Sequence, residues 1–179
     1  MGDREERVFV RMFQETPHWW AQRAAASGSG GDGDLPDVTF AQEGIAFAGE
    51  EKTTSEPYIY VQEDELEALR AYADAYGMET ILIGRFKGER AFYVWNPEDM
   101  ERTNAGTYRG SPGDEKWAAK IAEPDGSAEG VYPEDLTAFA LYHSVNGRLG
   151  KGMVEAPKPD PAAMWGSDQD QDQGGEADG

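Results

Sequence analysis

The sequence contains no cysteine and only two histidines, His18 and His143. The absence of cysteine excludes disulfide bridges, thiolate metal sites and cysteine nucleophiles. With so few imidazoles, a divalent metal site must rest on carboxylates, and such oxygen ligands suit Mg²⁺ or Mn²⁺ better than Zn²⁺. No apolar run approaches the roughly 20 residues that cross a bilayer, and the N-terminal residues lack the apolar stretch of a signal peptide. We therefore expect a cytoplasmic protein without a membrane partner.

Basic residues are also scarce: 16 Lys and Arg stand against 35 Asp and Glu, for a net charge of −19. From Glu155 onward the sequence has seven acidic residues and one basic residue, Lys158. The residues before Glu155 also carry a net negative charge. An acidic protein normally repels nucleic acid, but in about 1 M salt the Debye length falls to roughly 3 Å and long-range repulsion nearly vanishes. The excess of acid over lysine, with many Gly and Ala residues, resembles proteins of extreme halophiles. The alternative is an acidic protein from a mesophile.

The length of 179 residues fits one domain, expected over residues 1–150, followed by an acidic disordered tail over 151–179. Apolar periodicity and turn residues predict a helix, three strands, a helix, two strands and a final helix. The predicted segments are Asp3–Glu15, His18–Ala24, Asp37–Ala41, Ile45–Lys52, Glu63–Tyr76, Thr80–Phe86, Ala91–Trp95 and Pro133–Asn146.

A Gly- and Ser-rich loop is expected over residues 26–34, and a tight turn at Glu43-Gly44. Asn96–Asp99 is expected to start a turn or a short helix. Phe92, Val94 and Trp95 are either core residues or an interface. The fold class is α/β, or α+β around a mixed sheet.

The pattern that suggests chemistry is Pro36-Asp37, twelve residues, then Glu50-Glu51-Lys52. Residues two apart on a strand share a face, so Glu50 and Lys52 lie side by side while Glu51 points away. If the strand of Asp37 pairs with this one, two carboxylates and an ammonium converge. Carboxylates can hold Mg²⁺ against a phosphate, and Lys52 can orient a water, act as its base or stabilise charge on the phosphate. The pattern is short, and these residues can equally be polar positions on solvated strands.

Further motifs give this pattern a context. The run Arg23-Ala-Ala-Ala-Ser27-Gly28-Ser29, then Pro36-Asp37, then Glu50-Glu51-Lys52, resembles the archaeal Holliday-junction resolvases of the PD-(D/E)xK nuclease superfamily, with their spacing kept. Three further segments resemble the family. They are the Glu6-Arg7 pair, residues 58–61 directly before the helix that is expected to start at Glu63, and the segment from Arg102 to Tyr108. The resemblance covers roughly residues 3–110 and, more loosely, 132–149.

The resemblance implies a restriction-endonuclease-like fold with a central mixed five-stranded sheet flanked by helices. It implies that Asp37, Glu50 and Glu6 hold Mg²⁺, with Mn²⁺ as a substitute, although Glu6 can instead position the water. Lys52 would be the catalytic lysine, and Ser27 the serine of a mobile loop. Arg23, Ser27, Ser29 and Arg7 would contact DNA.

The family's activity implies a homodimer that resolves four-way junctions by symmetrical paired nicks, in a nucleoid-associated location, with a sliding clamp or helicase as a possible partner. Two alternatives stay open: a related nuclease acting on flaps, single strands or duplex, and a non-catalytic paralogue that binds a partner. The family's basic N-terminal lead is replaced here by Gly2-Asp3, and the Lys or Arg after Ser29 by residues 30–34. This departure weakens the expectation of tight DNA binding at ordinary salt. Glu65 stands where some relatives have glutamine.

Overall fold

The computed structural model describes residues 2–24 and 35–147, with side chains from Arg4 onward. The predicted loop over 26–34, with Ser27 and Ser29, and the predicted tail over 151–179 lie outside the described residues. The elements are α1 (Gly2–Gln14), β1 (Trp20–Arg23), β2 (Val38–Gln42), β3 (Ile45–Thr54), β4 (Ile59–Val61), α2 (Glu63–Tyr76), β5 (Glu79–Phe86), β6 (Ala91–Trp95), η1 (Pro97–Asp99), β7 (Glu101–Arg102), β8 (Tyr108–Gly110), η2 (Pro112–Asp114), β9 (Ala119–Ala122), η3 (Pro133–Asp135) and α3 (Ala138–Val145).

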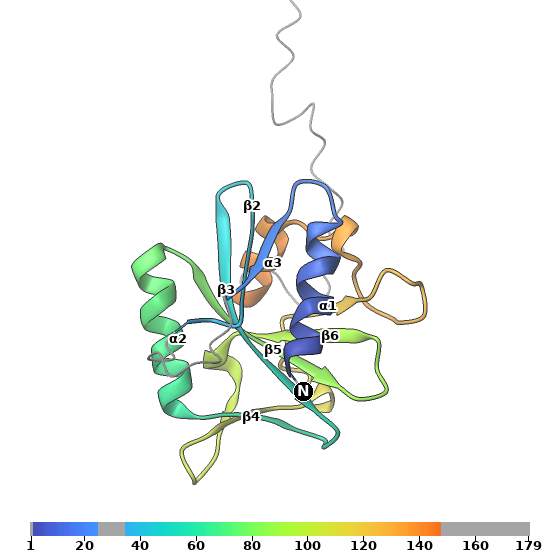
Figure 1. Ribbon diagram of the computed structural model, residues 1–179. Helices are drawn as coiled ribbons and strands as arrows, with labels where there is room; N and C mark the ends of the chain where they lie inside the picture. The colour runs from blue at the N-terminus through green and yellow to red at the C-terminus, as the bar shows by residue number, and fades with distance from the viewer. Residues whose placement is uncertain (1, 25–34, 148–179) are drawn as a thin grey trace, which may run out of the picture.

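The main sheet is mixed and has six strands in the order β1-β2-β3-β5-β6-β9 (Figure 1). Within it, β3 and β5 run parallel and the other neighbours run antiparallel. The expected number of five strands is therefore wrong. The sixth strand, β9, is four residues long and its extended form depends on pairing with β6, a contact distant in sequence. A second sheet of three short strands has the order β4-β8-β7.

The β2–β3 hairpin sets the register of the candidate site. Its turn residues Glu43 and Gly44 both have positive φ, 50° and 83°, as the two-residue turns that suit hairpin twist require. This turn pairs Gln42 with Ile45 and Val38 with Gly49. Asp37 therefore comes opposite Glu50. A shift of one residue would send one of the two side chains to the other face.

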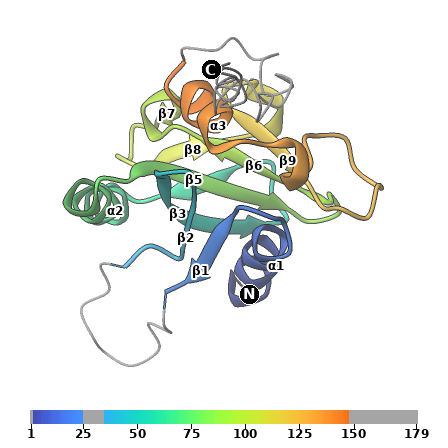
Figure 2. The same ribbon diagram turned by 90° about the horizontal axis from the view of Figure 1, so that it is seen from above.

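Two hydrophobic clusters cover the two faces of the sheet. Ile81 and Ile83 of β5 point into the first cluster, which includes the apolar faces of α1 and α3. Leu82, between them, points into the second, with α2 and the small sheet. Phe92, Val94 and Trp95 are all fully buried, which confirms them as core residues. Figure 2 shows β5 and β6 at the centre, with the three helices around them. The site therefore lies on strands that are held from both sides.

The final helix is shorter than expected. Only Ala138–Val145 is α-helical, and Pro133–Asp135 forms a separate 3-10 turn. The reason is local: Leu136 is extended, and the Thr137 side chain accepts a hydrogen bond from the Ala140 N–H, which starts the helix there. Among the described residues, no helix is long and apolar enough to span a membrane.

Candidate active site

Asp37 and Glu50 meet at the open end of the β2–β3 hairpin, as the turn geometry requires. Asp37 is held by β3 itself, because its Oδ2 accepts a hydrogen bond of 2.8 Å from the Glu51 N–H. Glu50 and Lys52 lie side by side on β3, with Lys52 Nζ 2.9 Å from Glu50 Oε1. The predicted convergence of two carboxylates and one ammonium is thus present in the fold.

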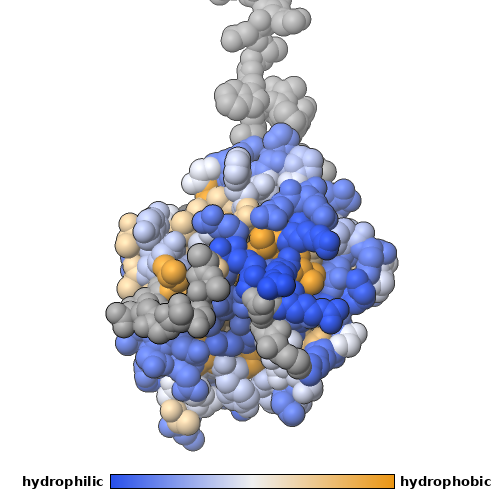
Figure 3. Space-filling view, viewed as in Figure 1, coloured by the Kyte–Doolittle hydropathy of each residue, from blue (hydrophilic) through white to orange (hydrophobic). Residues whose placement is uncertain are grey.

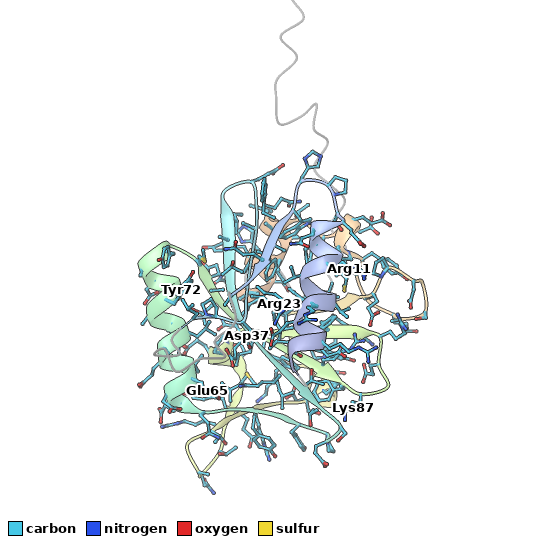
Figure 4. All side chains as sticks on the ribbon, in the orientation of Figure 1. Arg11, Arg23, Asp37, Glu65, Tyr72 and Lys87 are labelled. Carbon is cyan, nitrogen blue, oxygen red and sulfur yellow. The ribbon has the colours of Figure 1, made fainter. Side chains whose placement is uncertain are left out.

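A third carboxylate, that of Glu65, reaches Lys52 from α2. Lys52 Nζ lies 2.9 Å from Glu65 Oε1. In the sequence, Glu65 stood out only as a departure from some relatives, and no role was predicted for it. Nothing in local spacing would have revealed this contact, since it depends on how the first turn of α2 packs beside β3. Figure 4 shows Glu65 on α2, across from Asp37.

Glu6 and Arg23 form an ion pair beside the hairpin. Glu6 Oε2 accepts from both Nη2 of Arg23, at 2.9 Å, and its Nε, at 3.1 Å. Glu6 comes from α1 and Arg23 from the end of β1. Figure 4 shows Arg23 beside Asp37. The structure therefore brings the predicted Glu6 and Arg23 together, with Glu6 engaged by the arginine.

Burial and like charge define the electrostatics of this cluster. Burial, and then the nearby charge of Asp37, raise the pKa of Glu50 to about 7, because together they outweigh the opposing effect of Lys52. The same two causes raise the pKa of Glu6. Burial disfavours the charged form of Lys52, but the charges and hydrogen bonds of Glu50 and Glu65 have the larger combined effect. The pKa of Lys52 is therefore above its usual value. Among the roles considered for Lys52, this favours a cation that stabilises negative charge over a base.

Glu51 lies on the opposite side of β3 from Glu50 and is only 4% exposed. Its Oε1 accepts a hydrogen bond of 2.7 Å from the Thr53 hydroxyl. Its Oε2 is buried without a hydrogen-bond partner among residues 2–24 and 35–147. Burial is the main cause that raises the pKa of Glu51 to about 7. Ionised Glu51 is therefore a poorly solvated charge on the face of β3 opposite Glu50.

Asp37 and Glu50 suit a hard divalent cation. A cation between these two neighbouring carboxylates would stabilise both in their ionised form, including Glu50, whose pKa is raised by burial and by the charge of Asp37. In the part of the chain that the structure describes, no three His, Cys, Asp or Glu side chains form a ligand cluster. This donor set fits Mg²⁺, which commonly takes one or two carboxylates and completes its shell with waters and substrate phosphates.

A groove of about 1240 Å³ runs beside the site, between α1, β1 and the β5–β6 turn. Basic residues dominate its charged lining, which includes only two acids, Glu5 and Glu89. Its basic residues are Arg4, Arg7, Arg11, Arg23, Arg85 and Lys87. These are six of the 16 Lys and Arg of a strongly acidic chain, and Arg11, Arg23 and Arg85 among them are ion-paired with acids. Hydrophilic residues accordingly gather over α1 in Figure 3.

Arg23 belongs to both the groove and the Glu6 ion pair, and so connects the two. Arg4 and Lys87 make no ion pair with any of the described residues. Figure 4 shows Arg11 on α1 and Lys87 at the β5–β6 turn, on two different walls of the groove. The groove therefore presents basic side chains next to the carboxylates of the candidate site, which suits an anionic ligand.

Comparison with known proteins agrees with this geometry. The family model described as archaeal Holliday junction resolvase (Hjc) matches residues 1–117. Among solved structures, the chain is similar to the Holliday junction resolvase Hjc of Archaeoglobus fulgidus, an archaeal hyperthermophile. The TM-score is 0.55 and the identity 23%, over 63% of this chain and 89% of that one. No curated protein matches the chain. The family match spans more than half of the chain and includes all the residues of the candidate site, so this chain belongs to the archaeal Holliday junction resolvase family.

Proposed function

We propose that this resolvase is an endodeoxyribonuclease that hydrolyses phosphodiester bonds of four-way junctions with Mg²⁺, or Mn²⁺, as cofactor. One observation carries the proposal: Asp37, Glu50 and Lys52 converge at one end of the β2–β3 hairpin. Asp37 and Glu50 would hold the cation. When bound, Mg²⁺ would lower the pKa of a coordinated water and offset negative charge on the phosphate.

The chain's own side chains then divide the remaining work. Lys52, kept positively charged by its carboxylate neighbours, stabilises the charge that develops on the phosphate. Glu6, fixed by Arg23, orients the attacking water rather than completing the ligand set. Ser27 and Ser29, which lie outside the described residues, would also contact the DNA.

The basic groove is our candidate for the DNA path. Phosphates are bound by Lys and Arg, and the groove gathers six such residues next to the site. Arg7 and Arg23 would contact phosphates near the cut, while Arg4, Arg11 and Lys87 would contact the arm that extends from it. A symmetrical product requires two such sites, so we propose a homodimer that makes paired nicks.

We further propose that residues 1–150 form the nuclease domain and 151–179 an acidic tail. A sliding clamp or helicase would deliver the enzyme to recombination intermediates. Such substrates belong to the chromosome, which places the protein in the cytoplasm with the nucleoid.

The test is cleavage of a labelled four-way junction in molar KCl with Mg²⁺, beside a linear duplex and a flap. The Asp37→Asn variant is the control, because Asn can still accept the hydrogen bond from the Glu51 N–H while losing the charge. Loss of one charged ligand, worth several kcal/mol, should slow cleavage about 10³-fold.

Paired nicks on the junction alone, lost in Asp37→Asn, support the proposal. Equal cutting of the flap or duplex would leave a nuclease without junction selectivity. Absence of cutting by the wild-type protein at every salt concentration and with both metals would indicate a binding protein instead.

A further inference from the structure

The Glu65 carboxylate joins two parts of the molecule, with one oxygen used for each. Its Oε1 accepts from Lys52 Nζ on β3 at 2.9 Å. Its Oε2 accepts from the backbone N–H of Gln62, the residue that caps α2, also at 2.9 Å. Glu65 is the third residue of α2, so this second bond is half of a capping box and fixes the side chain to the helix start.

Lys52 needs an anchor of this kind. A lysine carries its charge on a flexible four-carbon stem, and fixing that stem requires contacts that outweigh the lost rotamer freedom. Glu50 is one contact, but it stands on the same strand as Lys52 and is also a candidate metal ligand. Glu65 approaches from a different element, and its own position is set by the helix cap. It is therefore the contact to Lys52 that does not depend on the arrangement of the metal ligands.

The surroundings of Glu65 support a role for the carboxylate beyond the cap. Glu65 lies beside Lys52, whose side chain is only 27% exposed, although Glu65 itself is partly open to solvent at 39%. A helix needs only one acceptor oxygen for the cap, and Glu65 has the second oxygen directed to the ammonium. The neighbouring acid Glu67, on the same helix, is exposed and makes no ion pair with any residue in 2–24 and 35–147.

We propose that Glu65 is a positioning residue, which holds the Lys52 ammonium at the cutting site and fixes it to the N-terminal cap of α2. The inference rests on the proposed function in that Lys52 is taken as the catalytic lysine. Lys52 would then be placed by two carboxylates from two different elements. Removal of the Glu65 charge should leave substrate binding intact while the lysine loses its fixed place.

The experiment compares Glu65→Ala, which leaves no side-chain oxygen for Lys52, with Glu67→Ala, which removes the same side chain two residues further along α2. The cleavage rate constant is measured on a saturating four-way junction, together with the DNA dissociation constant and thermal unfolding. Because misplacement of a catalytic group by about 1 Å can cost about 10²-fold, we expect Glu65→Ala to slow cleavage about 10- to 100-fold. Junction affinity should change by less than about twofold, and Glu67→Ala should cleave at the wild-type rate.

A second readout does not depend on cleavage. Metal-free full-length protein is treated briefly with acetic anhydride, and acetylation of Lys52 relative to the exposed Lys116 is measured by mass spectrometry. An amine that has lost a carboxylate partner is freer to react, so the Lys52 to Lys116 ratio should rise about threefold or more in Glu65→Ala and stay unchanged in Glu67→Ala.

The outcomes separate the two proposals. A slower cleavage rate with unchanged Lys52 acetylation would overturn the inference, because the loss would then come from the helix cap. An unchanged rate and unchanged acetylation would overturn it too. If the wild-type protein cuts nothing, the proposed function fails, and the acetylation ratio still decides whether Glu65 fixes Lys52.

Discussion

At the scale of single residues, Asp37 connects the parts of the site. It shares the hairpin end with Glu50, is hydrogen-bonded by the backbone of Glu51, and its charge acts on Glu6 as well. These acids come from α1, from the start of β2 and from both faces of β3. Asp37 is therefore the residue whose charge acts on both Glu50 of β3 and Glu6 of α1.

Glu51 gives a stability prediction with a definite sign. Its pKa is about 7 in the folded protein, against about 4.5 when unfolded, so the folded state favours the protonated form. The stability this contributes is full below the unfolded value and is lost as the pH rises through about 7. Glu51→Gln should therefore be more stable than the wild type at pH 8 by roughly 1–3 kcal/mol and equal to it near pH 4.5.

The measurement is urea unfolding in metal-free buffer at both pH values. Exposed Glu67→Gln is the matched control and should show no such dependence on pH. The same stability difference at both pH values would contradict the assignment of the buried charge to Glu51.

At the scale of elements, the indole of Trp95 joins the two sheets. An added Cβ at Gly84 of β5 would lie 2.6 Å from the Trp95 ring, and one at Gly110 of β8 would lie 2.9 Å from it. The ring therefore occupies space that two glycines leave open, one in each sheet. This packing places the small sheet against the strands that carry the site.

The substitution Gly84→Ala should destabilise the protein by about 1–3 kcal/mol, as overpacking of a well-filled core does. Gly113→Ala is the control, because the nearest atom to its added Cβ is the Ser111 Oγ at 3.8 Å. Its effect should stay within about 0.5 kcal/mol in thermal or urea unfolding. Equal effects of the two substitutions would show that Trp95 has room to move.

The elements that the sequence predicted well are those with strong local signals. The helix Glu63–Tyr76 has apolar residues at helical spacing and ends at Gly77, and its bounds are as expected. The hairpin of β2 and β3 follows from the Glu43-Gly44 turn, which also predicted the meeting of Asp37 and Glu50. In contrast, β8 and β9 are short strands that depend on distant partners, and nothing within their own residues indicates them.

The same division holds for the site. Alternation along one strand was enough to place Glu50 beside Lys52. The roles of Glu6, Arg23 and Ser27 came only from the family resemblance, since no local pattern connects α1 to the hairpin. Glu65 was missed because its contact with Lys52 arises from the packing of α2, which spacing along the chain does not encode.

At the scale of the whole molecule, a basic groove lies on a protein of net charge −19. The net charge and the charges of the groove act on DNA over different distances. At about 0.01 M salt the Debye length is roughly 30 Å, so DNA at a distance is repelled by the net negative charge of the whole protein. At about 1 M salt it is roughly 3 Å, so only charges close to the DNA, such as those of the groove, act on it. If the groove is the DNA path proposed above, the net charge should slow encounter at low salt, and the groove should determine the affinity of the bound complex.

We expect the association rate constant for junction DNA to rise about tenfold or more between about 10 mM and about 1 M KCl, opposite to a basic DNA-binding protein. Stopped-flow fluorescence with a labelled junction gives this constant. The double variant of Arg4→Gln with Lys87→Gln should weaken affinity throughout. It should also reduce the slope of log affinity against log salt by about 0.9 for each phosphate that is no longer neutralised. An association rate that falls steadily with salt would contradict the opposing roles of net charge and groove.

The parallel pairing of β3 with β5 also bears on the order in which the candidate site can form during synthesis. Asp37, Glu50 and Lys52 leave the ribosome early, but an isolated two-stranded hairpin is only marginally stable. The strand that carries them is held between neighbours only after residue 86, once α2 has crossed the sheet and β5 has paired. A growing chain shorter than this has the candidate site residues but no fixed place for them. If the proposed function holds, cleavage activity should therefore appear only in chains whose central strands are complete.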